Sequence, residues 1–545
     1  MTAPIHIFTK PDCPHCARAK EVLEANGLSY TAHDITADSD TAARAVYLSG
    51  LATVPQIFIG DTHVTGARDL VRLHEAGRLR ALAESAVGET DPARVSASRA
   101  RDGARDILLR DVIPESDGTH SEEPEDWPLL RFYKDFFGFW PNCFAYMHHW
   151  PEAYRLFVYA HNRGAIGLGR EVLGAPVMMA TGFATSNAGG CDYCQVHMTA
   201  AAGDMSARMP RLIEAARKGD APAASPIGPF ELELVELAAE SATNAVAPDR
   251  LDRIRACTAE ARVSDAGAEA NIMGTAMIAS AFGFLNTFND LTGVDVEPDW
   301  ARHSAEKAGV AHGRHAVGDD AVGGNLDHDL PQGGPTMDEM IARCDSAVAK
   351  AGGVEAFFRD DFGLVPDWVR VWPEDLRARH ALYYAEVMGA RAHSRLPAEL
   401  KHLVARVAAI AQGHDAIAAT EAAFDVRAGG GDETAVARAR LCFGAAIGRG
   451  GAEVFSVRER AALTVGWLSA QKPLTTPKRF IQPAIDHFDP VELVHLFTVC
   501  GLAGLVQRFC AITAPGMGPE VAGLAQRYGL DTDTLAIRYP LPAQA

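Results

Sequence analysis

The sequence predicts a multidomain protein in which a small α/β domain precedes two all-helical repeats. The chain of 545 residues is longer than the roughly 100 to 200 residues of one domain. Strand-like and helix-like segments alternate only in the N-terminal segment 1–84, and the remainder shows the apolar periodicity of helices. We therefore expect an α/β domain (1–84), a linker (85–125), a helical domain (126–305), a second linker (306–336) and a second helical repeat (337–545).

The N-terminal segment 1–84 contains short apolar stretches separated by turn residues and by amphipathic stretches. This alternation is typical of a small α/β domain. The expected order is a strand at 5–8, a helix after Cys13, a strand near 29–32, a helix, a strand at 55–59, and a final helix over about 69–83.

The two proposed linkers are polar and poor in large apolar residues. Segment 85–125 is rich in Arg, Asp, Ser and Glu, and segment 306–336 in Gly, His and Asp. Histidines spread through and near the second segment are typical of a solvated loop, although they could bind a metal: His303, His312, His315 and His328.

The helical part contains short sequence motifs that recur about 221 to 225 residues apart. Gly190-Cys191-Asp192 is echoed by Gly413-His414-Asp415, and Trp150-Pro151 by Trp372-Pro373. A near-constant offset through most of the helical part indicates a tandem duplication of one helical unit.

The composition restricts the partners. A formal net charge of −19 argues against nucleic acid or an anionic membrane, because both are bound through clustered Lys and Arg. No uninterrupted apolar run of about 18 residues would cross a bilayer, and residues 5–8 read as a strand rather than a secretory signal. We expect a soluble, cytoplasmic protein that acts on small molecules or proteins.

The ten cysteines are too sparse for a disulfide-stapled secreted protein. Four of them form two Cys-x-x-Cys pairs, which in a reducing compartment indicate redox chemistry or metal binding. The other six are expected to be buried, inert thiols: Cys143, Cys257, Cys344, Cys442, Cys500 and Cys510.

The first pair is Cys13-Pro14-His15-Cys16, placed where a strand gives way to a helix. Unpaired N–H groups at a helix N-terminus stabilise a thiolate on Cys13, and Lys10 adds positive charge. Cys16, one turn later, can attack a mixed disulfide on Cys13 and release the bound thiol. A zinc site would need two further ligands at matching spacing, and this domain offers none.

Residues 3 to about 83 resemble a glutaredoxin. The resemblance rests on the run from Phe8 to Cys16, the Thr53-Val54-Pro55 turn and the run from Thr65 to Leu70. It implies a thioredoxin-like fold, a cis proline, and glutathione as cosubstrate with no tightly bound cofactor. By position the glutathione site would comprise Lys10, Cys13, Thr53, Val54, Pro55, Gly66, Arg68 and Asp69. Thr65 and Arg68 depart from the family pattern, so a thioredoxin-like protein with another thiol donor stays an alternative.

The second pair, Cys191-Asp192-Tyr193-Cys194, follows two glycines and is followed by His197. Three residues of separation place Cys194 and His197 on one helical face, where an imidazole can exchange a proton with a thiol. Cys191 is placed to form a disulfide with Cys194. Two alternatives remain: a pair of buried cysteines with a core histidine, and a metal site of two cysteines and one histidine.

Residues from about 137 to 294 resemble the alkylhydroperoxidase D and carboxymuconolactone decarboxylase superfamily, which is all-helical and usually oligomeric. The resemblance rests on the Cys-x-x-Cys pair with its following histidine, and on the run from Phe284 to Asp290 with Gly293 behind it. The resemblance implies that Cys194 attacks peroxide, Cys191 resolves it, and His197 joins a proton relay. Met179 stands where the family has a relay glutamate, and Glu171 is the nearest upstream acid.

In the second repeat the corresponding positions are His414, Ile417 and Thr420, so we expect a structural half that occupies the place of a partner subunit. We also expect a homo-oligomer that assembles through the helical repeats.

The sequence thus predicts an oxidoreductase in which a glutaredoxin domain uses glutathione to reduce Cys191-Cys194, which in turn reduces a peroxide or an oxidised protein. Fusing donor to acceptor raises their effective concentration to about the millimolar range. The alternatives are a protein-disulfide or deglutathionylating reductase without peroxidase activity, and a redox-sensing binding protein. A carboxymuconolactone decarboxylase is disfavoured because its lactone chemistry needs no redox cysteine pair.

Overall fold

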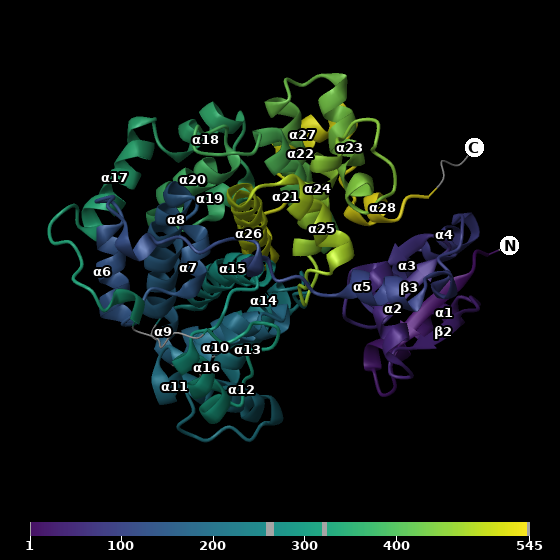
Figure 1. Ribbon diagram of the computed structural model, residues 1–545, viewed down its shortest axis with the longest axis horizontal. Helices are drawn as coiled ribbons and strands as arrows, with labels where there is room; N and C mark the ends of the chain where they lie inside the picture. Colours follow the sequence, from purple (N-terminus) through teal and green to yellow (C-terminus); the bar gives the residue numbers. More distant parts are fainter. Residues whose placement is uncertain (1, 258–265, 319–323, 542–545) are drawn as a thin grey trace.

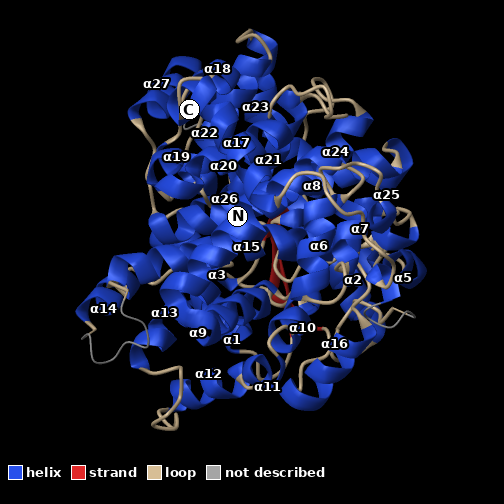
Figure 2. Ribbon diagram, turned by 90° about the vertical axis from the view of Figure 1, so that its left-hand side faces the viewer, coloured by secondary structure: helices blue, strands red, loops and turns tan. Residues whose placement is uncertain are grey.

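The computed structural model describes residues 2–257, 266–318 and 324–541. A small α/β domain at the N-terminus lies beside a larger helical body, and both chain ends lie on the side of the small domain (Figure 1). Outside the small sheet the described residues form helices and loops, with two isolated β-bridges, Asp106 with Pro477 and Val296 with Val317 (Figure 2). The expected division into one α/β part and a helical remainder is confirmed for the described residues.

The N-terminal domain is a four-stranded sheet in the order β2-β1-β3-β4, flanked by helices. Strand β1 pairs in parallel with β2, with His6 opposite Thr31, and antiparallel with β3, with Ile7 opposite Ile57. Strand β4 extends the antiparallel edge. All five residues of β1 are buried because strands flank it on both sides and helices cover it. The elements are β1 (Ile5–Thr9), α1 (Pro14–Ala25), β2 (Thr31–Asp34), α2 (Ser39–Ser49), β3 (Gln56–Ile59), β4 (Thr62–Val64), α3 (Ala67–Glu75) and α4 (Leu79–Ser85).

Two sequence expectations for this domain were wrong in detail. The short edge strand β4 was not expected, and the single final helix over 69–83 is two helices, α3 and α4. The break follows from Gly77, whose φ of 66° lies in the left-handed region that a helix cannot continue through. The apolar spacing carries across this turn, so periodicity alone did not reveal it.

The helical body begins with a first set of helices that contains the second Cys-x-x-Cys pair. Its longest members are α9 and α15, and α9 is interrupted at Gly174 (φ 73°), two residues before Pro176, which has no N–H to donate. The set comprises α6 (Trp127–Phe136), α7 (Asn142–Met147), α8 (Pro151–Phe157), α9 (Ile166–Gly189), α10 (Asp192–Ala200), α11 (Gly203–Ala207), α12 (Met209–Lys218), α13 (Pro229–Ser241), α14 (Arg250–Ala256), α15 (Ala268–Thr292) and α16 (Pro298–His303).

A second set of helices completes the body. Its longest member, α26, begins at a capping box formed by Asp489 and Glu492. The set comprises α17 (Met337–Lys350), α18 (Val354–Phe362), α19 (Asp367–Val371), α20 (Glu374–Met388), α21 (Ala398–Gln412), α22 (Asp415–Ala428), α23 (Glu433–Ala446), α24 (Val457–Ser469), α25 (Lys478–His487), α26 (Pro490–Thr513), α27 (Pro519–Tyr528) and α28 (Thr534–Arg538).

The long helices α15 and α26 pack against each other at the centre of the body. Their closest approach is at Gly283 and Gly504, where a Cβ added to either residue would lie 2.5 or 2.7 Å from the carbonyl oxygen of the other. Both helices are long and apolar enough to span a membrane, but 72% and 83% of their most apolar windows are buried inside the protein. Such burial is that of core helices.

Both segments that the sequence suggested as linkers make specific contacts. In the first, α5 (Ala97–Ala104) packs between α2 and α25, and Asp106 accepts hydrogen bonds from Thr476 and Arg314. In the second, His315 is completely buried, so the expectation of a solvated loop was wrong at this residue.

Candidate redox centres

The first cysteine pair lies at the N-terminus of α1. Cys13 is the N-cap residue, and its sulfur accepts a hydrogen bond from the amide of Cys16 at 3.2 Å. Burial, together with the hydrogen bond to Cys13, raises the pKa of Cys16 to about 11. Cys16 therefore stays a thiol at neutral pH, and Cys13 is the sulfur that receives the stabilising N–H donation at the helix end.

The Val54-Pro55 turn and the Gly66 turn both adjoin this pair. The Val54-Pro55 peptide bond is cis, and the thiol of Cys13 lies 3.9 Å from the carbonyl oxygen of Val54. Gly66 has a φ of 126°, and a Cβ at this residue would lie 3.5 Å from the carbonyl oxygen of Pro55. The structure thus brings together Cys13, the proline turn and Gly66, while the side chains of Lys10 and Thr53 are exposed near them in the chain.

Arg68 and Asp69, also assigned to the glutathione site, are in contact with the helical body. Asp69 is 2% exposed and accepts hydrogen bonds from Tyr539 (2.7 Å) and from Arg538. Burial alone would raise the pKa of Asp69, but Arg538 and the hydrogen bonds lower it below its usual value. Arg68 donates to the carbonyl oxygen of Thr243. The carboxylate of Asp69, which the resemblance assigns to the glutathione site, is therefore already bound by Arg538 and Tyr539 of the C-terminal segment.

The second cysteine pair is deeply buried at the start of α10. Gly190 ends α9 with a φ of 77°, Cys191 is the N-cap residue of α10, and Cys194 lies one turn later. The exposed fractions of Cys191 and Cys194 are 0% and 2%. Asn289 on α15 donates a hydrogen bond to the sulfur of Cys194 at 3.4 Å.

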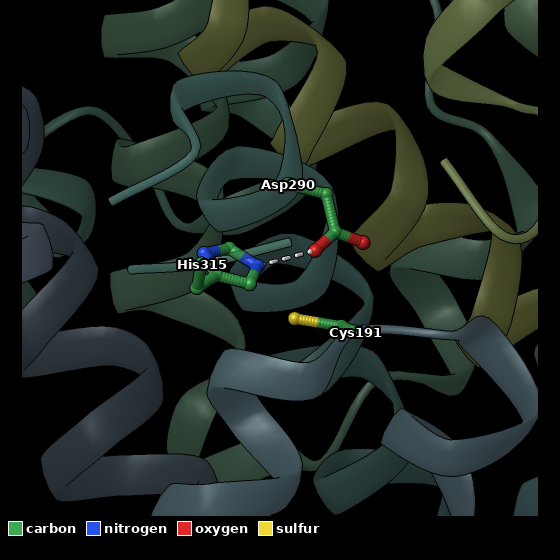
Figure 3. A group of neighbouring side chains, drawn as sticks. All are labelled: Cys191, Asp290 and His315. Atoms are coloured by element: carbon green, nitrogen blue, oxygen red, sulfur yellow. Dashed lines mark hydrogen bonds and ion pairs between the residues drawn. The ribbon is translucent and has the colours of Figure 1, made fainter. Parts of the chain in front are cut away.

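A histidine and a carboxylate face Cys191 (Figure 3). His315 Nε2 lies 3.2 Å from Asp290 Oδ1, and the ligand atoms of Cys191, Asp290 and His315 all lie within 4.8 Å of one another. Burial opposes protonation of His315, but its hydrogen bonds with Asp290 and Cys191 outweigh burial and raise its pKa to about 9. The imidazole is therefore protonated near neutral pH, within reach of the cysteine.

His197 contacts a different carboxylate from the one expected. Its Nε2 lies 2.6 Å from Glu297 Oε2, and the other carboxylate oxygen of Glu297 accepts a hydrogen bond from Tyr193 at 3.0 Å. Among the described residues no hydrogen bond joins His197 to Cys194. His197 is thus joined through the buried carboxylate of Glu297 to the buried hydroxyl of Tyr193, in a chain of hydrogen bonds beside the cysteine pair.

The second repeat supplies two cations to this centre, Arg508 on α26 and Lys472 in the segment between α24 and α25, and both interact with the charges of Asp290 and Cys191. Arg508 on α26 is buried, and no hydrogen-bond partner for its Nη1 and Nη2 atoms is found in the described part of the chain. Burial lowers its pKa to about 10, while Cys191, Cys194 and Asp290 act in the opposite direction. Lys472 precedes Pro473, and Pro473 packs so closely on Gly190 that a Cβ there would lie 2.4 Å away. The expectation of a purely structural second repeat missed this contribution.

Comparison with known proteins agrees with the geometry of the first centre. The family model described as Glutaredoxin matches residues 5–64. A glutaredoxin of Pseudomonas aeruginosa is 43% identical over 81 residues, which are 14% of this chain and 94% of that protein. The chain belongs to the glutaredoxin family through its N-terminal domain. The domain is therefore a thiol-disulfide oxidoreductase module with a thioredoxin-like fold.

Two further relatives place the glutaredoxin domain in context. The hybrid peroxiredoxin hyPrx5 of Haemophilus influenzae is 51% identical over 70 residues, which are 12% of this chain and 27% of that protein. A glutaredoxin of Brucella melitensis, solved in solution, is 40% identical, covers 15% of this chain and 90% of its own, and has a TM-score of 0.15. By sequence the glutaredoxin domain is thus similar to part of a larger protein, hyPrx5, and to nearly the whole of the Pseudomonas aeruginosa glutaredoxin.

Several residues of the second centre were missed by sequence reasoning. Glu171, the acid suggested as a substitute for the family glutamate, is exposed on α9. The carboxylates at the centre come instead from Asp290 and Glu297, which are buried. Asp290 is the last residue of the Phe284-to-Asp290 run on which the resemblance rests. Its place in that run was the one feature of the sequence that could have assigned Asp290 to the second centre.

The glutaredoxin domain contacts the second repeat at Gly413 and His414, the positions that correspond to Gly190 and Cys191 in the first repeat. A Cβ on Gly413 would lie 2.9 Å from Arg72 of α3, and burial, aided by Arg68 and Arg72, lowers the pKa of the adjoining His414 to about 3. His414 is separated from Cys191 by the repeat offset. The docking surface therefore includes the repeat without cysteines at these positions, together with Thr243 and Asn244 of the first repeat.

Proposed function

We propose that the protein is a glutathione-linked peroxide reductase in which the glutaredoxin domain reduces the Cys191-Cys194 pair. The observation that carries this proposal is the cluster around the pair: His315 beside Asp290 and Cys191, the His197-Glu297 pair, and Arg508, whose Nη atoms have no hydrogen-bond partner among the described residues. A thiol beside proton donors and a cation is the setting that covalent thiol chemistry requires.

The reaction begins with attack of the Cys194 thiolate on the peroxide O–O bond. The bond breaks, Cys194 becomes a sulfenic acid, and the alkoxide or hydroxide that leaves takes a proton from the centre, where His315 holds one. The Cys191 thiol then attacks the sulfenic sulfur, which forms the Cys191-Cys194 disulfide and releases water. Burial raises the pKa of Cys191 well above its usual value, so it suits the resolving step rather than the first attack.

Glutathione supplies the electrons in this scheme. The Cys13 thiolate attacks the Cys191-Cys194 disulfide and forms a mixed disulfide with one of its sulfurs. Cys16 then attacks Cys13, which forms the Cys13-Cys16 disulfide and releases the reduced Cys191-Cys194 pair. Two molecules of glutathione then reduce the Cys13-Cys16 disulfide and leave as glutathione disulfide.

Transfer between the two pairs requires a rearrangement. Cys13 is 8% exposed and Cys191 is completely buried, so the sulfurs cannot meet without local opening. The glutaredoxin domain remains tethered by residues 85–125, which keeps its effective concentration high during such an opening.

The test is NADPH consumption in the presence of glutathione, glutathione reductase and cumene hydroperoxide. The full-length protein is compared with C194S, with C13S and with residues 1–84 alone. We expect turnover by the full-length protein and loss of turnover in the three comparisons. Equal turnover by C194S and the unaltered protein would contradict a peroxidase centre at Cys194.

A second candidate function is a protein-disulfide or deglutathionylating reductase, which the family match to residues 5–64 favours. In that case the activity resides in Cys13 and Cys16, and residues 1–84 retain it towards a glutathionylated protein. Loss of that activity in the isolated domain would argue against this alternative.

A further inference from the structure

A buried histidine-carboxylate pair lies in the second repeat, on helices α20, α21 and α22, which carry none of the Cys-x-x-Cys cysteines. His402 Nδ1 lies 2.8 Å from Glu421 Oε2, and the hydroxyl of Tyr384 donates to Glu421 Oε1 at 2.8 Å. The exposed fractions of His402, Glu421 and Tyr384 are 1%, 3% and 1%. A histidine oriented by a carboxylate is the arrangement used for proton transfer and for binding polar ligands.

The pair opens onto a pocket of about 500 Å³, which is large enough for a small organic ligand. His402 lines this pocket together with the apolar side chains of Phe362, Leu396 and Phe424. The Nδ1 atom of His402 is engaged by Glu421, and the described residues provide no hydrogen-bond partner for its Nε2 atom. A polar atom of a buried side chain that lines a cavity without a partner indicates a ligand or water in that position.

Arginine side chains also line the pocket. Arg391 is paired with Asp361, and Arg395 with Asp489. Arg427 has no carboxylate within 4.0 Å in the part of the chain that the structure describes, and its guanidinium passes over Gly363, where the absence of a side chain makes room for it. The acidic residues of the lining are Asp361, already neutralised, and Glu399. The pocket therefore offers a cation that lacks an anion.

His402 stands at the position of the second repeat that corresponds to Met179 of the first repeat. The offset in the chain between Met179 and His402 is the same as the offset between Cys191 and His414. At these positions the first repeat has the thioether of Met179 and the Cys191-Cys194 pair. The second repeat has the imidazole of His402 and no cysteine pair. The second repeat keeps ionisable groups of a different chemistry in the same helical frame.

We propose that this pocket binds a small organic carboxylate, whose anionic end lies on Arg427 and whose other polar end accepts a hydrogen bond from, or donates one to, His402 Nε2. The two groups differ in kind: a guanidinium binds a carboxylate in a bidentate manner, whereas an imidazole binds a single polar atom. The ligand is therefore a carboxylate with a second polar group, and the apolar walls accommodate its carbon chain. This inference does not depend on the proposed peroxidase activity.

The test is isothermal titration of the full-length protein with succinate and with citrate, and with succinamide as the uncharged control. We expect saturable binding of at least one of the two carboxylates at about millimolar concentration or below, and none of succinamide. R427A should weaken binding about tenfold, and H402Q should weaken it as well, whereas R211A, which removes an exposed arginine on α12, should bind like the unaltered protein.

Absence of saturable binding by both carboxylates would overturn the proposal, as would equal binding by R427A and the unaltered protein. H402Q leaves Glu421 without its histidine and could unfold the repeat, so its circular dichroism is recorded first. Arg427 is exposed at the pocket rim, so its replacement should leave the fold intact. The binding measurement on R427A therefore tests the proposal even when H402Q does not fold.

Discussion

Asp69 and Arg538 form a buried ion pair between residues 469 positions apart in the chain. The pair joins α3 of the glutaredoxin domain to the C-terminal segment, with α28 at the edge of the helical body that faces the small domain (Figure 1). Asp69 was assigned to glutathione by resemblance, so Arg538 and glutathione would compete for one carboxylate.

R538A is therefore expected to lower the KM for glutathione severalfold. The variant frees a charged hydrogen-bond acceptor, an effect on the order of 1 kcal/mol. The measurement is steady-state reduction of hydroxyethyl disulfide by glutathione, with R440A as control because Arg440 is exposed and donates its hydrogen bond to the carbonyl oxygen of Tyr528 rather than to Asp69. An unchanged KM in R538A would show that Asp69 does not bind glutathione.

The resolving and attacking sulfurs should be distinguishable by trapping. In C191S the sulfenic acid formed on Cys194 lacks its resolving thiol, so peroxide treatment should allow a dimedone adduct at residue 194. In C194S no adduct is expected, because the pKa of Cys191 is raised by burial and it remains a thiol. Mass spectrometry of the tryptic peptide is the measurement; an adduct on Cys191 in C194S would reverse the assignment.

Titration of His315 should make stability pH-dependent. Its pKa is raised from 6.5 to about 9 in the folded protein, so its stabilising contribution is fully present below pH 6.5 and is lost as the pH rises through about 9. The shift corresponds to on the order of 3 kcal/mol. We expect the urea midpoint to fall between about pH 6.5 and 9.5 more steeply for the unaltered protein than for H315N. Parallel pH profiles would contradict the raised pKa.

The sequence predicted the elements whose signals are local, and it missed contacts that only folding creates. The strand and helix around Cys13 follow from apolar alternation and a helix N-terminus, so they could be predicted. His315 gave no such signal, because its polar, glycine-rich neighbours are typical of a loop. Arg508 could not be assigned to Cys191 either, since it lies in the other repeat and reaches the centre only because α26 packs on α15.

The approach of α15 and α26 should be sensitive to a single methyl group. In G283A the new Cβ would lie 2.5 Å from the carbonyl oxygen of Gly504, so the helices must separate, at a cost of about 1 to 3 kcal/mol. G523A is the matched control, since Gly523 lies on α27 with nothing within 4 Å of the added Cβ, and alanine favours a helix by up to about 1 kcal/mol. Denaturant unfolding of both variants is the measurement. Equal stability of the two would show that the helices do not meet at these glycines.

Arg508 connects the second repeat to the chemistry of the first, and its replacement should separate the two activities. Arg508 is buried, lacks a hydrogen-bond partner for its Nη atoms among the described residues and interacts with the charges of Cys191 and Cys194. A cation at this place stabilises a thiolate and the charge that develops on the leaving oxygen.

R508M should therefore lower the second-order rate constant for peroxide reduction by about 10- to 100-fold, a loss of roughly 1.4 to 2.7 kcal/mol of transition-state stabilisation. Reduction of hydroxyethyl disulfide, which depends on Cys13 and Cys16, should be unchanged in the same preparation, and the circular dichroism of R508M serves as the control for folding of the helical body. R508K keeps the charge and should recover part of the rate. If R508M and R508K lose the same activity, the guanidinium acts through packing rather than through its charge.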